Sequence, residues 1–336
     1  MIISVICGKG SPGASTAALG MTLCWPRPVL LVEADPAGGS LALGYAAGAD
    51  VGGRSLTGVR VAARRSGMAP AIWANVVTLG ENRWLLPGVD TTQQAATIDY
   101  PALASALAGL GVDVIIDAGR IPAPVRHDAL WAAADVVIVA TRSTLPSVHS
   151  AQIAAAVARE AIGATGPVLQ SVIVGASRPY SERDIRAAMA DISPVAGVLA
   201  WDPAAAGALA DARPAPRAFA SSPLMRSAAR LAKSIAQQAE LGQVAAGQTE
   251  GAAAKQGRAG PAASASALTG DGDASGSGLM EADWAEHERA ASAAIAYPHA
   301  GGHSQAPVHR ADAAASSARH TARAPAAATV RTGGTL

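Results

Sequence analysis

Short and nearly continuous runs of hydrophobic residues recur along the first two thirds of the chain. Such runs are typical of strands that are buried on both faces of a parallel sheet. Segments with helical periodicity separate them, and this alternation predicts an α/β fold whose mostly parallel, twisted sheet is covered by helices on both faces. The predicted strands are Ile2–Cys7, Val29–Glu33, Val76–Thr78, Trp84–Leu86, Val112–Asp117, Val136–Ala140, Leu169–Val174 and Val195–Leu199.

The segments between these strands predict helices. One of them, Thr91–Gly109, contains Pro101. Because a proline inside a helix removes a backbone hydrogen bond and clashes with the preceding turn, we expect two helices there rather than one. The other predicted helices are Ser15–Cys24, Pro124–Ala133, Pro146–Ile162, Ser181–Asp191 and Pro223–Leu241.

The hydrophobic pattern fades after about Gly242. From there to Leu336 the chain is rich in Ala, Gly, Ser, Thr and His and has few large apolar residues. Such a segment cannot bury enough surface to offset the entropy of an ordered chain. We therefore expect one domain over residues 1–241 and a disordered, low-complexity tail over residues 242–336. Glu281–Tyr297 could form a short docking helix, but a transient helix is the interpretation we favour.

Composition narrows the class of protein. The net charge is +1 over 336 residues, which provides no general attraction to nucleic acid or to an anionic membrane. The two cysteines, Cys7 and Cys24, form no disulfide framework and suit a reducing cytosol. We see no secretory pattern and no apolar run of transmembrane length. The sequence therefore predicts a cytoplasmic protein without an integral membrane segment.

The stretch GKGSPGAST follows the first predicted strand and leads into the first predicted helix. A strand, a glycine-rich turn and a helix form the setting in which backbone N–H groups bind phosphate. Gly8 and Gly13 have the spacing of a P-loop, and Ser15 stands at its hydroxyl position. Ala14 stands where a P-loop has its lysine, whereas a lysine occurs earlier, at Lys9.

The same stretch also fits a dinucleotide-binding motif. Gly8, Gly10 and Gly13 form G-x-G-x-x-G, Ala17 follows at a small position, and Glu33 lies where such a fold places its ribose-binding acid. A Rossmann oxidoreductase is thus one alternative. A tight strand–helix turn that binds no ligand is another.

Further acids and hydroxyls favour the P-loop. Ser15 and Thr16 place hydroxyl groups at the start of the helix, where a P-loop has its magnesium ligand. Asp35 adds a second acid after the second strand, and Asp117 ends a strand of the Walker B form. No convincing substrate domain of an oxidoreductase follows the predicted sheet.

These residues resemble the MinD/ParA superfamily of P-loop ATPases. KGSPGAST resembles their deviant Walker A box, EADP their D-x-D-P, and DVIIDAG their Walker B strand. The stretches WLLPGVDTTQQAA, ADVVIVATRSTLPSVHSAQ and VAGVLAWDPAAAGAL resemble later motifs of the family in the same order, so that the resemblance covers Met1 to Leu241.

The resemblance implies ATP and Mg²⁺ as cofactors and a nucleotide-dependent homodimer. Lys9 would reach across the dimer to the partner's phosphates, and Asp35 would position the attacking water. Ser15 would ligate Mg²⁺ directly, and Asp117 would hold it through water. The other residues that the resemblance places at the nucleotide are Gly8, Gly10, Ser11, Gly13, Ala14, Thr16, Trp201 and Asp202.

The chain also departs from the family pattern. Ala14 replaces the phosphate lysine, Glu33 replaces the first Asp of D-x-D, and Pro12 removes a backbone donor. Lysine occurs only at positions 9, 233 and 255, so its use in the loop favours a role for a compact ammonium beside phosphate. A first lysine without the second resembles the TadZ/CpaE branch, which positions secretion or pilus machinery.

We therefore expect an ATP-binding protein with weak or slow ATPase activity that acts as a dimer switch. The machine that it positions would be a Tad-type pilus or secretion system, whose ATPase would be a partner, or the septum site. One alternative is a partitioning ATPase that binds DNA non-specifically through arginines. Another is a scaffold that does not hydrolyse ATP. The arginine clusters, which we interpret first as solvated faces, are Arg54, Arg60, Arg64, Arg65, and Arg213, Arg217, Arg226, Arg230.

Overall fold

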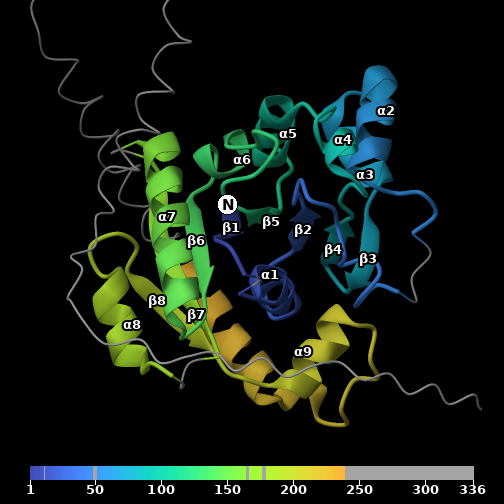
Figure 1. Cartoon of the computed structure of the whole chain (residues 1–336). Coiled ribbons are helices and arrows are strands. Elements are labelled where there is room, and N and C mark those ends of the chain that lie inside the picture. The colour runs from blue at the N-terminus through green and yellow to red at the C-terminus, as the bar shows by residue number, and fades with distance from the viewer. Residues whose placement is uncertain (11, 48–50, 164–165, 176–178, 239–336) are drawn as a thin grey trace, which may run out of the picture. The chain divides into compact units, whose positions relative to one another are not determined.

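The strands predicted from the hydrophobic runs are all present, and they form one sheet of eight strands (Figure 1). This computed structural model describes residues 1–10, 12–47, 51–163, 166–175 and 179–238. The order across the sheet is β3-β4-β2-β5-β1-β6-β7-β8, and β3 is antiparallel to β4 while the other neighbours run parallel. The strands are β1 (Ile2–Cys7), β2 (Val29–Glu33), β3 (Val77–Gly80), β4 (Arg83–Leu86), β5 (Asp113–Arg120), β6 (Val136–Thr141), β7 (Val168–Val174) and β8 (Val195–Leu199).

The helices confirm the expected break at Pro101. Residues 91–109 contain two helices, and Pro101 lies in the first turn of the second, where its missing N–H costs nothing. The carboxylate of Asp99 caps this helix by accepting the N–H of Ala102 at 3.0 Å. The helices are α1 (Ala14–Leu23), α2 (Leu56–Ser66), α3 (Met68–Ala74), α4 (Thr92–Ala95), α5 (Tyr100–Ala108), α6 (Ala129–Ala132), α7 (Leu145–Ile162), α8 (Glu182–Met189) and α9 (Pro203–Ala210), with a further helix over residues 223–238.

Two parts of the helical pattern differ from the prediction. The sequence pattern did not single out the helices α2, α3 and α9. In contrast, α6 is much shorter than the predicted Pro124–Ala133. The buried ring of His127 explains this, because its nitrogens lie 2.8 Å from the carbonyl oxygen of Ala118 and 3.0 Å from that of Val125. These contacts hold the residues before α6 in a loop.

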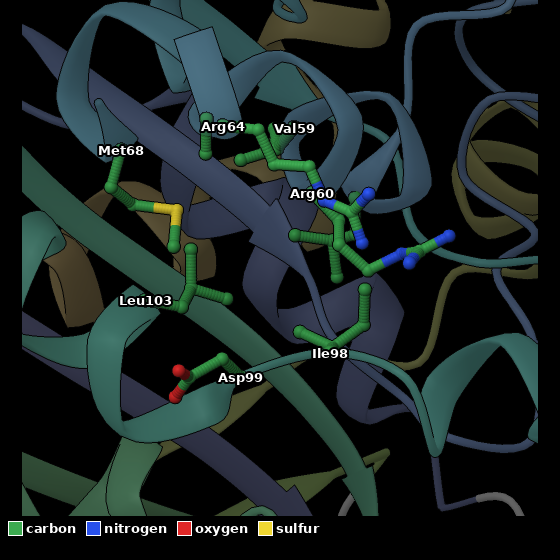
Figure 2. Close-up of a pocket in the computed structure, with 9 residues that line it drawn as sticks. Val59, Arg60, Arg64, Met68, Ile98, Asp99 and Leu103 are labelled. Carbon is green, nitrogen blue, oxygen red and sulfur yellow. The ribbon is translucent and has the colours of Figure 1, made fainter. Parts of the chain in front are cut away.

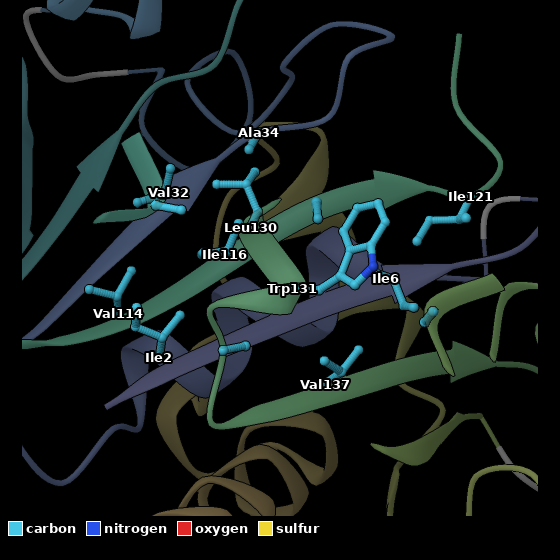
Figure 3. Packing of buried hydrophobic residues seen from close by; sticks show 14 of the residues in the cluster. Ile2, Ile6, Val32, Ala34, Val114, Ile116, Ile121, Leu130, Trp131 and Val137 are labelled. Atoms are coloured by element: carbon cyan, nitrogen blue, oxygen red, sulfur yellow. The ribbon is translucent and has the colours of Figure 1, made fainter. Parts of the chain in front are cut away.

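Alternate residues of each central strand pack on opposite faces of the sheet. Ile2 and Ile6 of β1 lie on one face with Val114 and Ile116 of β5, under Trp131 of α6 (Figure 3). The opposite face packs against α1, α9 and the helix over residues 223–238. Asp117 alternates with Ile116, so it lies on the face that α1 covers.

The described residues end before the predicted tail. Residues 242–336, which include Glu281–Tyr297, lie outside them, as does the end of the predicted helix Pro223–Leu241. Within the described part of the chain, no helix combines the length and the apolarity needed to cross a bilayer.

Candidate functional site

The glycine-rich turn joins the central strand β1 to α1. Gly13 precedes α1 with φ 100° and ψ 31°, and Gly10 has φ 96°, so both occupy conformations that favour glycine. Ser11 lies outside the described residues. Because α1 begins at Ala14, the unpaired N–H groups of its first turn are available at the carboxyl edge of the parallel strands. This is a site suited to an anion.

The turn is held tightly against α7. A Cβ atom built on Gly8 would lie 2.2 Å from the backbone oxygen of Ser150, so only glycine fits there. The hydroxyl of Ser150 also donates to the carbonyl oxygen of Lys9 at 3.1 Å. The side chain of Lys9 itself is exposed, and it forms no ion pair with the described residues. Within the described part of the chain, no carboxylate therefore neutralises the ammonium group.

Asp117 lies beneath the start of α1 with its carboxylate almost fully buried. An irregularity in the β1–β5 pairing comes directly after it, since Val5 pairs with Asp117 but Ile6 pairs with Gly119. The carboxylate accepts the N–H of Gly119 at 3.3 Å, and the neighbouring Ser15 side chain acts to lower its pKa. Burial, followed by the charges of Glu33 and Asp35, raises the pKa of Asp117 to about 7.

No basic side chain pairs with Asp117 among the described residues. A buried carboxylate without a cation is unfavourable unless a ligand supplies the charge. Oxygen ligands from a hydroxyl and a carboxylate are the kind that Mg²⁺ binds. Ser15 and Asp117 therefore fit a magnesium ion that a nucleotide brings with it.

Asp35 reaches the same edge from the end of β2. Its side chain lies directly against Gly119, where an added Cβ would come within 2.1 Å of the Asp35 Cγ. One carboxylate oxygen accepts the N–H of Ala37 at 2.8 Å, which fixes the turn after the strand. The fold thus brings Asp35, Asp117 and Ser15 together, as the sequence predicted.

Glu33 has a different role from the one that a dinucleotide site would give it. Its Oε1 accepts the N–H groups of Ser40 at 2.5 Å and Leu41 at 2.7 Å, and its Oε2 accepts that of Gly88 at 3.0 Å. The side chain is buried and ties two loops to β2. A carboxylate engaged in this way is not available to a ribose hydroxyl, which argues against the oxidoreductase alternative.

Trp201 and Asp202 follow β8, two strands beyond β6 in the sheet. Asp202 caps α9, because its Oδ1 accepts the N–H of Ala205 at 3.1 Å. Trp201 is 61% exposed, which is unusual for so large an apolar side chain. The guanidinium carbon of Arg142 lies 5.6 Å from the centre of its ring. We assigned no role to Arg142 from the sequence, although a charged residue directly after a buried strand was a usable signal.

An apolar hollow of about 260 Å³ lies away from this site (Figure 2). Leu56 and Val59 of α2 and Leu103 of α5 contribute to its walls, and Arg60 and Arg64 stand beside them. These two arginines are half of the first cluster that the sequence showed. None of the residues predicted to bind nucleotide lines the hollow.

No protein-family model and no curated protein matches the chain, whereas several solved structures do. The septum site-determining protein MinD from Pyrococcus horikoshii, complexed with Mg-ADP, is 20% identical, with a TM-score of 0.57 over 71% of this chain and 97% of that one. A ParA family ATPase from Chlorobium tepidum is 16% identical, with a TM-score of 0.55 over 69% and 96% of the two chains. A putative plasmid partition protein from Borrelia burgdorferi, bound to AMPPNP, is 13% identical, with a TM-score of 0.52 over 70% and 98%. At these identities the likeness shows the fold, and it confirms the predicted MinD/ParA-like architecture.

Proposed function

We propose that this chain, which has the MinD/ParA-like fold, is a nucleotide-dependent dimer switch that binds ATP with Mg²⁺ and hydrolyses it weakly or slowly. The observation that carries the proposal is the buried carboxylate of Asp117, which lies next to Ser15 at the start of α1. Ser15 and Asp117 are the two groups that a P-loop site uses for its metal, and among the described residues no side-chain cation pairs with Asp117. We assign this function to residues 1–241 and treat residues 242–336 as a separate tail.

Each residue has a task that its position supports. The N–H groups of Gly13, Ala14 and Ser15 would bind phosphate, while Ser15 and, through water, Asp117 would hold Mg²⁺. Bound Mg²⁺ would neutralise charge on the transferred phosphoryl group. Asp35, beside Gly119, would orient the attacking water. Exposed Lys9 would reach the nucleotide of a second copy.

Ala14 limits how strongly one chain binds nucleotide. A missing charge-assisted contact to phosphate costs about 2–3 kcal/mol, which is about two orders of magnitude in affinity. A lysine from a second copy would restore charge at the site. Binding and dimerisation would then be coupled, because each chain completes the site of the other.

The comparisons support nucleotide binding in this fold, since one similar structure holds Mg-ADP and another AMPPNP. They include proteins of septum-site determination and plasmid partition. We propose that this chain likewise positions a machine, a Tad-type pilus or secretion system or the septum site, through a partner such as a secretion ATPase at the membrane. The arginines would instead support partitioning on DNA, which predicts ATP-dependent binding that weakens as salt rises. A scaffold that does not hydrolyse ATP predicts no turnover, and its binding to a partner or to DNA would not depend on nucleotide.

Replacing Lys9 with alanine is expected to abolish the dimer that forms with Mg-ATP. The monomer should still bind ATP, but up to about two orders of magnitude more weakly than the unmodified chain, because no second copy completes its site. Calorimetry measures the affinity, and light scattering of the full chain with and without Mg-ATP measures the mass.

Lys233→Ala is the matched control, because Lys233 is also exposed but belongs to the helix over residues 223–238 and not to the P-loop. Its dimer should be unchanged. A Lys9→Ala protein that dimerises as well as the control would contradict the switch. A chain that binds no ATP at millimolar concentration would leave the scaffold as the better proposal.

A further inference from the structure

The P-loop lacks a cation of its own at the usual position. Ala14, the first residue of α1, is 5% exposed, and its methyl group provides no charge. Lys9 is exposed, and its ammonium group forms no ion pair with the described residues. A polyphosphate bound to the monomer would therefore need a different cation from the same chain to neutralise its charge.

Arg142 is placed to do this. It follows β6, which pairs with β1 so that Cys7 lies opposite Ala140, and it therefore emerges beside the turn. Its Nε lies 3.5 Å from the carbonyl oxygen of Pro12, within the P-loop. No carboxylate lies within ion-pair distance of Arg142 in the described ranges, so its charge is not neutralised.

The position of Arg142 is fixed from two sides. Its backbone N–H donates to the Ser147 hydroxyl in the first turn of α7 at 2.8 Å. Its guanidinium group lies over Trp201, with the carbon atom 5.6 Å from the ring centre, within the range of a cation–π contact. Gly175 makes room for this arrangement, since a Cβ there would lie 2.6 Å from the Trp201 ring. The contact between Arg142 and Trp201 thus depends on residues that follow three strands, β6, β7 and β8.

We propose that Arg142 is the intramolecular cation for the nucleotide polyphosphate and takes over the charge that Ala14 lacks, with Trp201 as its platform. This rests on the proposed function. A guanidinium can donate two parallel hydrogen bonds to phosphate, which are stronger than a bond to a neutral carbonyl. The long contact to Pro12 can therefore be exchanged for a phosphate oxygen while the face of the guanidinium stays on the indole.

The test compares ligands that share a base and differ in charge. ATP, ADP and adenosine are titrated with Mg²⁺ into the full chain by calorimetry, and tryptophan emission is followed in parallel. Arg142→Met keeps the length of the side chain and removes its charge. It should lower the affinity for ATP and for ADP by at least tenfold, or about 1.4 kcal/mol at 25 °C. The affinity for adenosine should change less than twofold. Ala14→Lys added to Arg142→Met should restore ATP affinity.

Arg183→Met is the matched control, because Arg183 is exposed on α8 and should leave all three ligands unaffected. Arg142→Lys keeps the charge but cannot donate two parallel hydrogen bonds to phosphate. Its ATP affinity should therefore lie between those of the unmodified chain and Arg142→Met. Thermal melting without ligand checks that the variants fold.

The outcomes separate the two proposals. If Arg142→Met lowers the affinities for adenosine and ATP equally, Arg142 contacts the base, and the inference is overturned. Unchanged ATP affinity in Arg142→Met would overturn it while the proposed function stands. An unmodified chain that binds no ATP would overturn both.

Discussion

Replacing Glu33 with alanine is expected to lower the free energy of unfolding by about 3–5 kcal/mol, since a buried charged acceptor is lost and its donors remain. The carboxylate accepts three backbone N–H groups, from Ser40, Leu41 and Gly88. Without it, these groups either stay unpaired in the interior or pull their loops toward water. Denaturant unfolding of the full chain, followed by circular dichroism, measures the change.

Glu81→Ala is the matched control, because Glu81 is exposed in the turn between β3 and β4 and should change stability by less than about 0.5 kcal/mol. Glu33→Gln adds a second comparison. It keeps the volume but turns an amide N–H₂ toward a backbone N–H, so it should also destabilise the fold. A Glu33→Ala protein as stable as the control would show that the two loops do not depend on this carboxylate.

Replacing Asp117 with asparagine is expected to stabilise the nucleotide-free protein at pH 8 by about 2–4 kcal/mol while it removes the Mg²⁺-dependent part of ATP binding. Burial raises the pKa of Asp117 from 3.8 to about 7. Between these two values the folded chain holds a proton that the unfolded chain has released. Stability therefore falls as the pH rises through this window, and the penalty is complete above pH 7. Asparagine does not titrate and has nearly the same volume as aspartate.

Urea unfolding at pH 5 and pH 8, with a chelator present, measures this difference. The gain from Asp117→Asn should be large at pH 8 and small at pH 5. Asp191→Asn is the matched control, because Asp191 is exposed at the end of α8 and should show no such pH dependence. If Asp117→Asn lowers stability at pH 8, the carboxylate is stabilised by a partner other than metal, and Asp117 is a structural acid.

The central strands could be predicted because a strand buried on both faces leaves a continuous apolar run, as in Val136–Thr141. The break at Pro101 followed from the chemistry of proline alone. The helix α2 could not be predicted in this way, because Gly58 and its arginines obscure the pattern and its apolar residues Leu56 and Val59 are buried only by tertiary contacts. The loop that shortens α6 depends on His127, whose partners are nine and two residues away.

Some residues of the candidate site could likewise be predicted from the sequence, and others could not. Ser15, Asp35 and Asp117 could be placed together from sequence, because the carboxyl ends of neighbouring parallel strands share one edge. The role of Glu33 could not, since its three donors belong to two loops whose path no motif specifies. Arg142 was missed for a related reason, because its contacts to Pro12 and Trp201 join segments that are distant in sequence.

The close packing of Gly8 against Ser150 couples the position of α7 to the position of the turn. With no room for a methyl group between them, a shift of the turn toward α7 would have to displace the first turns of this helix. This helix has 18 residues and therefore spans about 27 Å. Farther along it, the Arg159 guanidinium donates to the carbonyl oxygen of Ile192, just after α8. Occupancy of the turn would thus be communicated to a distant surface, where a partner could detect it without touching the nucleotide.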